Sequence, residues 1–364
     1  MGEPLNVGVI GAGNISGAYL RTLENLPGLR VAAIGDRDPQ RAAAAAEPTS
    51  GARAATPEEI VGNAGIDVVL NLTPPAAHAQ VALAAIAAGK HVYGEKPLAA
   101  DRADAAVVCD AAAAAGLRVG CAPDTVLGTG IQTARASIEQ GLIGTPTSAM
   151  AVFSCFGHER WHPDPEFYYQ PGGGPLLDMG PYYLSALVHM LGPVKSVTGA
   201  ASRPRPDRIV ASGPRAGTSF SATIDTHVTA ILEHESGALT TLVMSFDVLA
   251  SRASDIEVHG TGGSLLVPDP NHFDGDVMLS TPEESGWRTL PPSAGYVAAS
   301  RGYGLAEMAR AISEERPHRC SAELAYHVLD CSHTLLQAAQ ERTTLKVLSR
   351  CDLPPLLPLA PLSD

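Results

Sequence analysis

The sequence predicts two folded parts: an N-terminal α/β domain with a doubly wound parallel sheet, and a C-terminal α+β domain built on a large, mostly antiparallel sheet. Three observations lead to this prediction. The chain of 364 residues is longer than one hydrophobic core usually organises. Short apolar runs alternate with helical windows up to residue 122. From residue 123 onward, strand-like alternation dominates most of the chain.

The elements of the first domain follow one another as strand and helix. Asp38 before Pro39 is typical of a helix start, with an N-cap followed by proline at the first helical position. Alanine-rich tracts fall inside helix-compatible windows. The expected strands are 5–10, 30–35, 68–72, 91–93 and 118–121, and the expected helices are 15–25, 39–46, 76–88 and 103–115.

The second domain begins with an expected helix at 131–140, which Gly141 ends. The turn residues 234–237 predict a hairpin over 226–246. Helical windows return at 303–315 and 322–339, and a proline-rich tail follows. Further expected strands are 147–153, 255–260 and 264–267. The expected domain bounds are 1–122 and 123–350, with a tail at 351–364.

Composition excludes several classes of function. The chain carries a formal charge of −13 and shows no basic cluster, so a nucleic-acid partner is not expected. It has no apolar run long enough to cross a bilayer and no basic segment before its first apolar stretch, so we expect a cytoplasmic protein without membrane contact. Its six cysteines form no C-x-x-C pair, which argues against a metal site or a disulfide framework and for mostly buried thiols. A small-molecule ligand is the better expectation.

A glycine motif directly follows the first expected strand. Gly11, Gly13, Asn14 and Ile15 open the first helix, with Ser16 at the position of the third glycine. In this context G-x-G-x-x-G holds a pyrophosphate on helix N–H groups, and a small residue in third place still allows close packing. A tight turn without function is the alternative interpretation. The motif predicts dinucleotide binding.

The end of the second strand supports the same prediction. Asp36 stands where an acidic side chain hydrogen-bonds the adenosine ribose and repels a 2′-phosphate, which favours NAD. Arg37 follows it and could accept that phosphate, so NADP stays open as the cofactor. A plain helix cap is the structural alternative for Asp36.

Two further loops follow strands of the expected parallel sheet. Thr73, Pro74 and His78 come after one strand, and Glu95 and Lys96 come after the next. Open α/β sheets bind ligands at the carboxyl ends of their strands, so both loops are expected to face the cofactor. A lysine before proline is held out of helical geometry and can point into the crevice. The alternative is a solvated surface lysine.

The glycine turn, Asp36 and the sequence Glu95-Lys96-Pro97 resemble the Gfo/Idh/MocA family of oxidoreductases over nearly the whole chain. The resemblance implies a Rossmann fold and an NAD(P)-dependent dehydrogenase or reductase acting on CH–OH groups. It also implies that Lys96 touches both the substrate hydroxyl and the nicotinamide.

The family's second motif, a glycine run followed by D-x-G-x-H, is matched at 172–183, except that Tyr182 replaces the histidine. Asp178 and Tyr182 are four residues apart, so on one helix they would share a face. A phenol has a pKa of about 10, which a neighbouring ammonium lowers. The resemblance makes Lys96 that neighbour, with Tyr182 as its acid/base partner and Asp178 as a third catalytic residue. Alternatively, Asp178 caps a helix and Tyr182 is core.

Substrate contacts are expected from an aromatic segment at 158–172. Trp161 and His162 lie in it, and aromatic faces and imidazoles suit a sugar ring. The same segment could instead close a subunit interface. Asp124, just past the last strand of the first domain, is a further expected substrate contact.

The expected function is therefore hydride transfer between a nicotinamide and a hydroxyl-bearing carbon of a sugar, sugar derivative or polyol, with Lys96 and Tyr182 as the acid/base pair. One alternative is a redox-neutral lyase or glycosidase that keeps NAD bound and oxidises a sugar transiently. Another is a cofactor-binding regulatory subunit, against which Lys96, Asp178 and Tyr182 argue. Relatives form homodimers or homotetramers, and the same is expected here.

Overall fold

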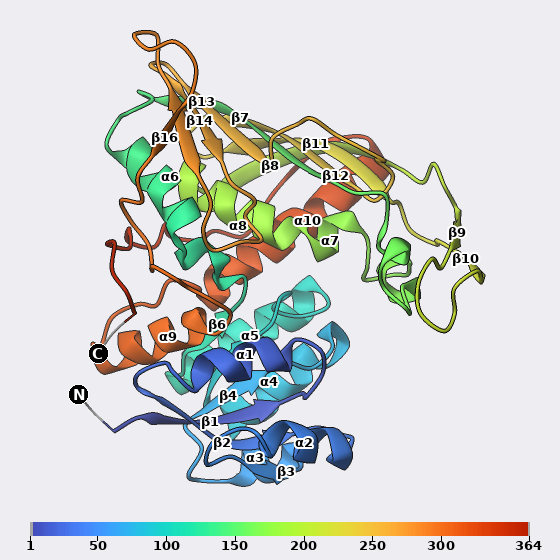
Figure 1. The fold of residues 1–364 in the computed structure, drawn as a ribbon, viewed down its shortest axis with the longest axis vertical. Coiled ribbons are helices and arrows are strands. Elements are labelled where there is room, and N and C mark those ends of the chain that lie inside the picture. The colour runs from blue at the N-terminus through green and yellow to red at the C-terminus, as the bar shows by residue number, and fades with distance from the viewer. Residues whose placement is uncertain (1–2, 363–364) are drawn as a thin grey trace. The chain divides into compact units, whose positions relative to one another are not determined.

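The computed structural model describes residues 3–362. Its contacts divide the chain into two compact units (Figure 1). The first comprises residues 3–129, Ala294–Leu329 and 354–362, and the second comprises Gly130–Ser293 and Asp330–Leu353. The first unit thus takes in a helix and a tail from beyond the boundary expected at residue 122.

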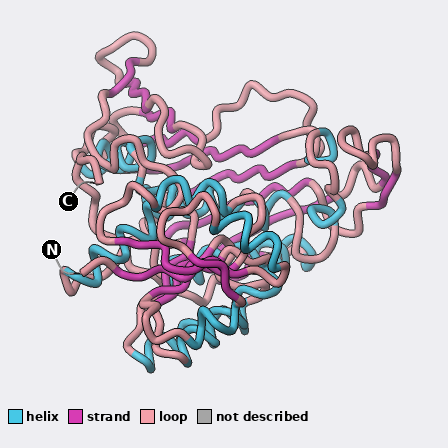
Figure 2. The backbone as a smooth tube through the Cα atoms, turned by 60° about the horizontal axis from the view of Figure 1, so that its bottom comes forward, coloured by secondary structure: helices cyan, strands magenta, loops and turns pink. Residues whose placement is uncertain are grey.

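The first unit holds a parallel six-stranded sheet with the order β3-β2-β1-β4-β5-β6, which Figure 2 shows as magenta strands near the centre. This order is that of a doubly wound dinucleotide-binding fold, with a switch of direction between β1 and β4. The strands are β1 (Leu5–Ile10), β2 (Leu29–Gly35), β3 (Arg53–Ala55), β4 (Val68–Asn71), β5 (His91–Gly94) and β6 (Val119–Cys121). The predicted fold class of this domain is confirmed.

Helices of the first unit follow the predicted windows closely. Asp38 caps α2 by accepting the N–H of Gln40 at 2.9 Å, as its place before Pro39 predicts. The helices up to residue 127 are α1 (Ser16–Leu23), α2 (Pro39–Ala46), α3 (Pro57–Gly62), η1 (Pro75–Ala77), α4 (His78–Ala87), α5 (Arg102–Ala115) and η2 (Asp124–Leu127). The short β3 and α3 are not among the predicted elements, although Thr56 and Glu59 form a capping box before α3.

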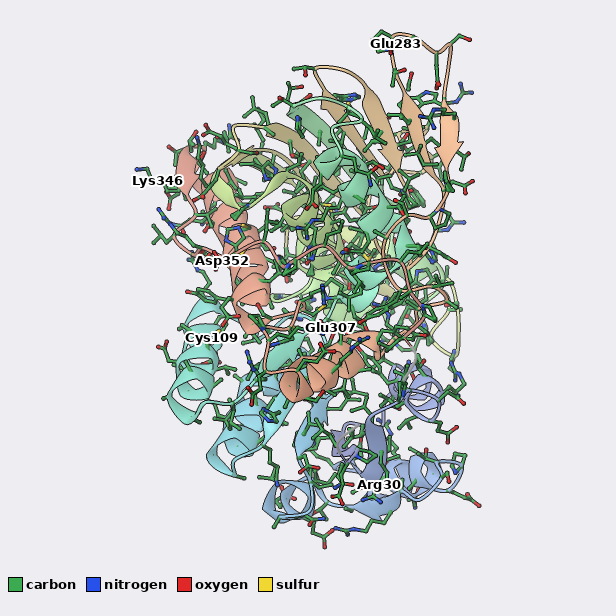
Figure 3. The ribbon with its side chains drawn as sticks, turned by 90° about the vertical axis from the view of Figure 1, so that its left-hand side faces the viewer. Arg30, Cys109, Glu283, Glu307, Lys346 and Asp352 are labelled. Atoms are coloured by element: carbon green, nitrogen blue, oxygen red, sulfur yellow. The ribbon has the colours of Figure 1, made fainter. Side chains whose placement is uncertain are left out.

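A helix from late in the chain completes this unit. α9 (Tyr303–Ser313) packs on β6 and η2. Its Glu307, labelled in Figure 3, is buried and accepts hydrogen bonds from Arg316 and Arg319. The tail joins it too, because Ala294 pairs with Pro358 in an isolated bridge. These contacts explain why the segment groups with the parallel sheet.

The second unit is built on a nine-stranded mixed sheet with the order β16-β15-β14-β13-β7-β12-β11-β8-β17. Only β7 and β12 pair in parallel; all other neighbours in this sheet are antiparallel. The hairpin expected over 226–246 forms from β11 and β12. The strands are β7 (Pro146–Ser154), β8 (Val194–Ser202), β11 (His227–His234), β12 (Leu239–Ser245), β13 (Ile256–Gly260), β14 (Ser264–Val267), β15 (Val277–Ser280), β16 (Arg288–Leu290) and β17 (Thr344–Lys346). The predicted mostly antiparallel sheet is confirmed.

One face of this sheet is packed and the other is open. α8 is buried along its whole length, and α7 packs on β11 and β12. On the opposite face Met150, Ile231 and Leu239 are exposed. The remaining elements are α6 (Thr129–Glu139), η3 (His158–Arg160), η4 (Glu166–Tyr169), α7 (Pro175–Asp178), α8 (Gly180–Leu191), the strand pair β9 (Asp207–Ile209) and β10 (Ser219–Ser221), and α10 (Ala322–Glu341).

Candidate active site

The predicted glycine turn forms between β1 and α1. Gly11 has φ +106°, and a Cβ there would lie 2.6 Å from the carbonyl of Leu72, so only glycine fits. Gly13 is exposed, and a Cβ at this position would meet no atom within 4 Å, so its backbone faces open space. Ser16 donates its hydroxyl to the carbonyl of Gly13 at 2.7 Å. The turn therefore leaves room for a ligand in front of the first N–H groups of α1, where Asn14 and Ile15 also lie exposed.

Asp36 joins the end of β2 to this turn. One carboxylate oxygen accepts the N–H of Ala12 at 2.8 Å, and the other accepts the N–H of Asp38 at 2.9 Å. Each oxygen keeps a second lone pair for a ribose hydroxyl. Arg37 is exposed beside it. These contacts fit the adenosine end of a dinucleotide.

The loop after β4 is shaped by Asn71, a buried residue that the sequence did not single out. Its side-chain oxygen accepts the hydroxyl of Thr73 at 2.6 Å, and its amide donates to the carbonyl of His78 at 3.1 Å. Pro74 follows in extended conformation and directly precedes η1. The loop is thereby held by its own neighbours.

His78 is predicted to contact the cofactor, but its side chain lies inside the protein. The residue is 2% exposed, and its ring nitrogens lie 2.6 Å from the carbonyl oxygen of Pro97 and 2.7 Å from that of Thr73. His78 thus connects the Thr73 loop to the loop that bears Lys96.

Glu95 holds the backbone of Lys96. One of its carboxylate oxygens accepts the Lys96 N–H at 3.0 Å, and the other accepts the hydroxyl of Tyr19 at 2.8 Å. Burial, with the charges of Glu95 and Asp124, raises the pKa of Tyr19 well above its usual value, so the phenol stays a donor. Lys96 is half-buried at the carboxyl edge of the parallel sheet, as predicted for a residue after β5.

Asp124, expected as a substrate contact, is fully buried. Its carboxylate accepts the N–H of Gly302 at 2.8 Å and that of Gly304 at 3.2 Å, and Arg301 lies 3.5 Å away. Burial raises the pKa of Asp124 above its usual value, against the opposing charge of Arg301. The side chain holds the start of α9; a substrate contact stays a prediction.

In the second unit, the glycine run that precedes α7 packs against the aromatic segment. A Cβ at Gly173 would lie 2.6 Å from the carbonyl oxygen of Phe167, and Gly174 donates its N–H to the carbonyl of Tyr168 at 2.8 Å. At Gly173 the backbone of the aromatic segment occupies the space that a side chain would need, whereas a Cβ at Gly172 would meet no atom within 4 Å. The run therefore fits that segment closely against the start of α7.

Asp178 and Tyr182 do not lie on one continuous helix. α7 ends at Asp178, Met179 separates it from α8, and Tyr182 lies in the first turn of α8. The prediction from four-residue spacing on one helix is wrong at this point. Tyr182 is 7% exposed, and the side chain of Asp178 is 18% exposed.

The aromatic segment approaches Asp178 through His158, whose Nε2 lies 2.9 Å from the Asp178 carboxylate. The His158 ring packs against Trp161 and Tyr168, with ring centroids 5.2 and 4.5 Å apart. Trp161 is 58% exposed, and half-buried His162 packs against it. The predicted substrate residues Trp161 and His162 thus belong to one cluster of rings beside Asp178.

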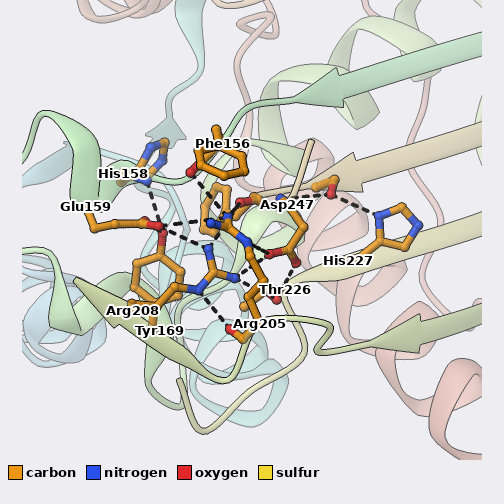
Figure 4. A network of polar contacts seen from close by, with 11 residues as sticks. Phe156, His158, Glu159, Tyr169, Arg205, Arg208, Thr226, His227 and Asp247 are labelled. Atoms are coloured by element: carbon orange, nitrogen blue, oxygen red, sulfur yellow. Dashed lines mark hydrogen bonds and ion pairs between the residues drawn. The ribbon is translucent and has the colours of Figure 1, made fainter. Parts of the chain in front are cut away.

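The base of this segment is held by a buried polar network (Figure 4). Glu159 accepts hydrogen bonds from Tyr169 and Arg208. Arg208, fully buried, also donates to Asp247, which in turn accepts the hydroxyl of Thr226 at 2.6 Å. Partners on the segment and the sheet satisfy these charges, so the segment is fixed to the sheet.

A cavity of about 510 Å³ opens in the second unit beside the glycine run. Its lining is apolar except for Asp225, Gln340 and Arg342. The full lining is Gly172, Gly173, Gly174, Pro175, Leu176, Leu177, Ala200, Ala201, Ile224, Asp225, Val228, Leu336, Ala339, Gln340 and Arg342.

The described residues hold neither a metal cluster nor a membrane-spanning helix. Within 3–362, no His, Cys, Asp or Glu side chains gather in a group of three or more that could hold a metal ion. No helix in the described part of the chain combines the length and apolarity needed to cross a membrane. None of the six cysteines, all of them among the described residues, forms a disulfide bond; Cys121, Cys320 and Cys331 are buried.

The doubly wound sheet, the glycine turn and the polar loops at its carboxyl edge define a dinucleotide-binding protein. Residues 5–122 match the oxidoreductase family with an NAD-binding Rossmann fold, and residues 131–266 match the GFO/IDH/MocA C-terminal domain. The chain belongs to the Gfo/Idh/MocA family and is an NAD-binding oxidoreductase. The family resemblance seen in the sequence is confirmed.

Similar proteins of named activity include 1,5-anhydro-D-fructose reductase of Ensifer adhaerens, which is 30% identical over 71% of this chain and 74% of that protein. Inositol 2-dehydrogenase 3 of Saccharopolyspora erythraea is 28% identical over 81% of this chain and 78% of that protein.

Among solved structures, an NAD binding oxidoreductase from Klebsiella pneumoniae has a TM-score of 0.83 and 24% identity, covering 95% of this chain and 100% of that one. Levoglucosan dehydrogenase in complex with NADH and L-sorbose has a TM-score of 0.80 and 23% identity, covering 95% of this chain and 99% of that one. At these identities the likeness shows the fold.

The sequence did not single out Asn71 or Tyr19, and it named His158 only as part of the aromatic segment. Asn71 ends β4 two residues before Thr73, and a polar residue at the end of a buried strand is a local signal for such a contact. Tyr19 and Glu95 meet only because α1 and β5 fold together. Lys96 belongs to the first unit, and Asp178 and Tyr182 belong to the second. That the three residues act together in catalysis stays a prediction.

Proposed function

We propose that this protein oxidises or reduces a hydroxyl-bearing carbon of a sugar, sugar derivative or polyol. Lys96 and Tyr182 form the acid/base pair, and Asp178 orients the reacting hydroxyl. NAD, when bound, takes up or returns the hydride. The names of the similar proteins, a sugar reductase and an inositol dehydrogenase, support this class of substrate.

The observation that carries the proposal is the support around Lys96. Glu95 holds the Lys96 backbone, and His78 connects the Lys96 loop to the Thr73 loop. Both loops follow neighbouring strands, β4 and β5, at the edge where such sheets bind ligands. A small displacement of a catalytic group is costly in rate. The contacts that hold the Lys96 loop therefore favour a role of Lys96 in proton transfer.

In the oxidation direction, Asp178 accepts a hydrogen bond from a neighbouring hydroxyl of the substrate and so sets the direction of the reacting hydroxyl. Tyr182, as a phenolate that the Lys96 ammonium stabilises, takes the proton of the reacting hydroxyl as the carbonyl forms. In the reduction direction, Tyr182 and Lys96 return that proton to the new alkoxide. The N–H groups at the start of α1 would hold the pyrophosphate of the dinucleotide, and the Asp36 carboxylate would hold its adenosine ribose.

The test is absorbance at 340 nm with a panel of sugars and polyols, supplying NAD and NADP separately and checking the purified protein for bound cofactor. We expect reduced NAD to accumulate with at least one cyclic sugar or polyol. Tightly bound NAD with no net reduction on any substrate would contradict the proposal and favour a redox-neutral lyase or glycosidase.

Variants test the residue roles. Lys96→Met and Tyr182→Phe should each lower kcat by about 10²- to 10⁴-fold, as for loss of a general acid or base. Lys346→Met, at an exposed lysine on β17, is the matched control and should keep wild-type turnover. Full activity of Tyr182→Phe would remove the tyrosine from the acid/base pair.

A further inference from the structure

The contact between His158 and Asp178 joins two segments of the second unit. His158 opens η3, and Asp178 ends α7. His158 Nε2 lies 2.9 Å from the Asp178 carboxylate, and the two side chains are only 9% and 18% exposed. Little water competes for this pair, so the charges interact more strongly than on a surface.

The His158 ring has little freedom to move. Besides Trp161 and Tyr168, it packs against Phe246, with ring centroids 4.4 Å apart. Its backbone N–H donates to the Tyr169 hydroxyl at 3.0 Å. The next residue, Glu159, belongs to the buried network with Arg208 (Figure 4). The imidazole is therefore held from the sheet side before it meets Asp178.

We infer that His158 is a positioning residue that keeps the Asp178 carboxylate ionised and in one orientation through a buried imidazolium–carboxylate pair. This inference rests on the proposed function, in which Asp178 orients the substrate hydroxyl. A fixed, ionised Asp178 can only accept from the hydroxyl next to the reacting one, whereas a protonated carboxyl could also donate and would allow a second orientation of the substrate.

The charge state of the pair agrees with its geometry. Burial by itself would lower the pKa of His158, but the hydrogen bonds and charges of Asp178 and Cys155 raise it to about 9. Of the other ionisable side chains, Tyr168 packs on the His158 ring and the Tyr169 hydroxyl accepts the His158 backbone N–H. The neighbouring Glu159 is paired with Arg205 and Arg208. A pKa of about 9 keeps His158 protonated at neutral pH, as a pair with the Asp178 carboxylate requires.

The first experiment is a double-mutant cycle on kcat and KM. His158→Phe keeps a ring in the aromatic cluster and removes the contact with Asp178, and it should lower kcat by roughly 10- to 100-fold, as for misplacement of a catalytic group. In the Asp178→Asn background the same change should cost nothing further, because the two residues act through one interaction. His158→Gln, which keeps an N–H donor, should restore part of the rate.

Two controls separate positioning from general stability. His272→Gln removes a histidine from a surface pair with Asp269, where the His272 side chain is 69% exposed, and should leave both constants unchanged. The affinity for NADH, bound by the first unit, should also be unchanged in His158→Phe. A wild-type kcat in His158→Phe, or losses that multiply in the double variant, would overturn the inference and leave the proposed function standing.

A spectroscopic measurement covers the case in which His158→Phe does not fold. The ¹⁵N shifts of the His158 ring should show both nitrogens protonated at pH 7.5 in the wild type. In Asp178→Asn they should show a neutral ring at the same pH. A neutral His158 in the wild type would refute the charged pair. If Asp178→Asn retains full kcat while the wild-type ring is doubly protonated, the pair exists and the catalytic role of Asp178 fails.

Discussion

At the scale of the residue, the side chains that support the proposed chemistry are held by partners distant in sequence. His78 meets two backbone carbonyls, Glu95 meets Tyr19, and His158 meets Asp178. None of these supporting contacts is made by an exposed pair, so each is worth more than a surface interaction. Their loss should be measurable in both stability and turnover.

The histidine that connects two loops offers the first prediction at this scale. His78→Asn should shorten the side chain so that its contacts with the Thr73 and Pro97 carbonyls are lost. Each buried acceptor left without a donor costs about 1 to 3 kcal/mol. We expect a lower free energy of unfolding in urea titrations and a lower kcat, since the Lys96 loop is no longer held. Unchanged stability would show that the ring is not bonded at both nitrogens.

The second prediction at this scale concerns how the free energy of unfolding depends on pH. The pKa of His158 is about 9 in the folded protein and 6.5 as an ordinary value. The folded state therefore binds more protons than the unfolded state between these values, so the stabilisation present below pH 6.5 is lost as the pH rises toward 9. Its full size is roughly 3 kcal/mol.

The unfolding free energy of the wild type and of His158→Phe, measured by urea titration from pH 6 to 9.5, checks this. The wild type should lose stability more steeply across the window, and His272→Gln should follow the wild type. Parallel curves for wild type and His158→Phe would contradict a raised pKa at this site.

At the scale of the element, the glycines before α1 and α7 are required for different steric reasons. Gly11 is required by the close carbonyl of Leu72, whereas Gly13 faces open space. At Gly173 a side chain would clash with the backbone of the aromatic segment. The helices begin where they do because the preceding turns can adopt conformations that side chains would prevent.

The two glycines of the first turn can be separated by experiment. Gly11→Ala should destabilise the fold by about 1 to 3 kcal/mol, through its positive φ and the contact with Leu72. Gly13→Ala should stay within about 0.5 kcal/mol of the wild type but weaken NADH binding, because the new methyl faces the ligand. Thermal unfolding and NADH fluorescence titration measure the two effects. Equal NADH affinity in Gly13→Ala and wild type would place the cofactor away from this turn.

At the scale of the whole molecule, the nine-stranded sheet has one face with exposed apolar side chains among the described residues. Met150 pairs with Thr241, and Thr241 pairs with Ile231, so these side chains share that face. Met150 is 46% and Ile231 is 52% exposed. Exposed apolar side chains gathered on one face are typical of a surface that meets another protein. It supports the prediction of a homodimer or homotetramer.

Sedimentation velocity tests the predicted assembly. The wild type should sediment as a dimer or tetramer, and the double variant Met150→Lys/Ile231→Lys should sediment as a smaller species. Leu249→Lys, at a loop leucine that is 73% exposed, is the control and should not change the mass. A wild-type monomer at micromolar concentration would show the prediction to be wrong.

The sequence by itself determined the elements whose signals are local. The apolar runs of β1 and β4, the cap of α2, the glycine turn and the Glu95-Lys96-Pro97 motif depend only on neighbouring residues, and these identified the fold class and the family. Short strands such as β3 and β17 were not predicted, because three residues are too few to show a periodic pattern.

Only the tertiary structure decided which groups the motif residues meet. It turned His78 inward, buried Asp124 against the start of α9, interrupted the helix between Asp178 and Tyr182, and brought His158 to Asp178. It also joined Ala294–Leu329 to the parallel sheet. The physical reason is the same throughout: these contacts join residues far apart in the chain, and their free energy depends on burial and geometry that exist only once the sheets have formed.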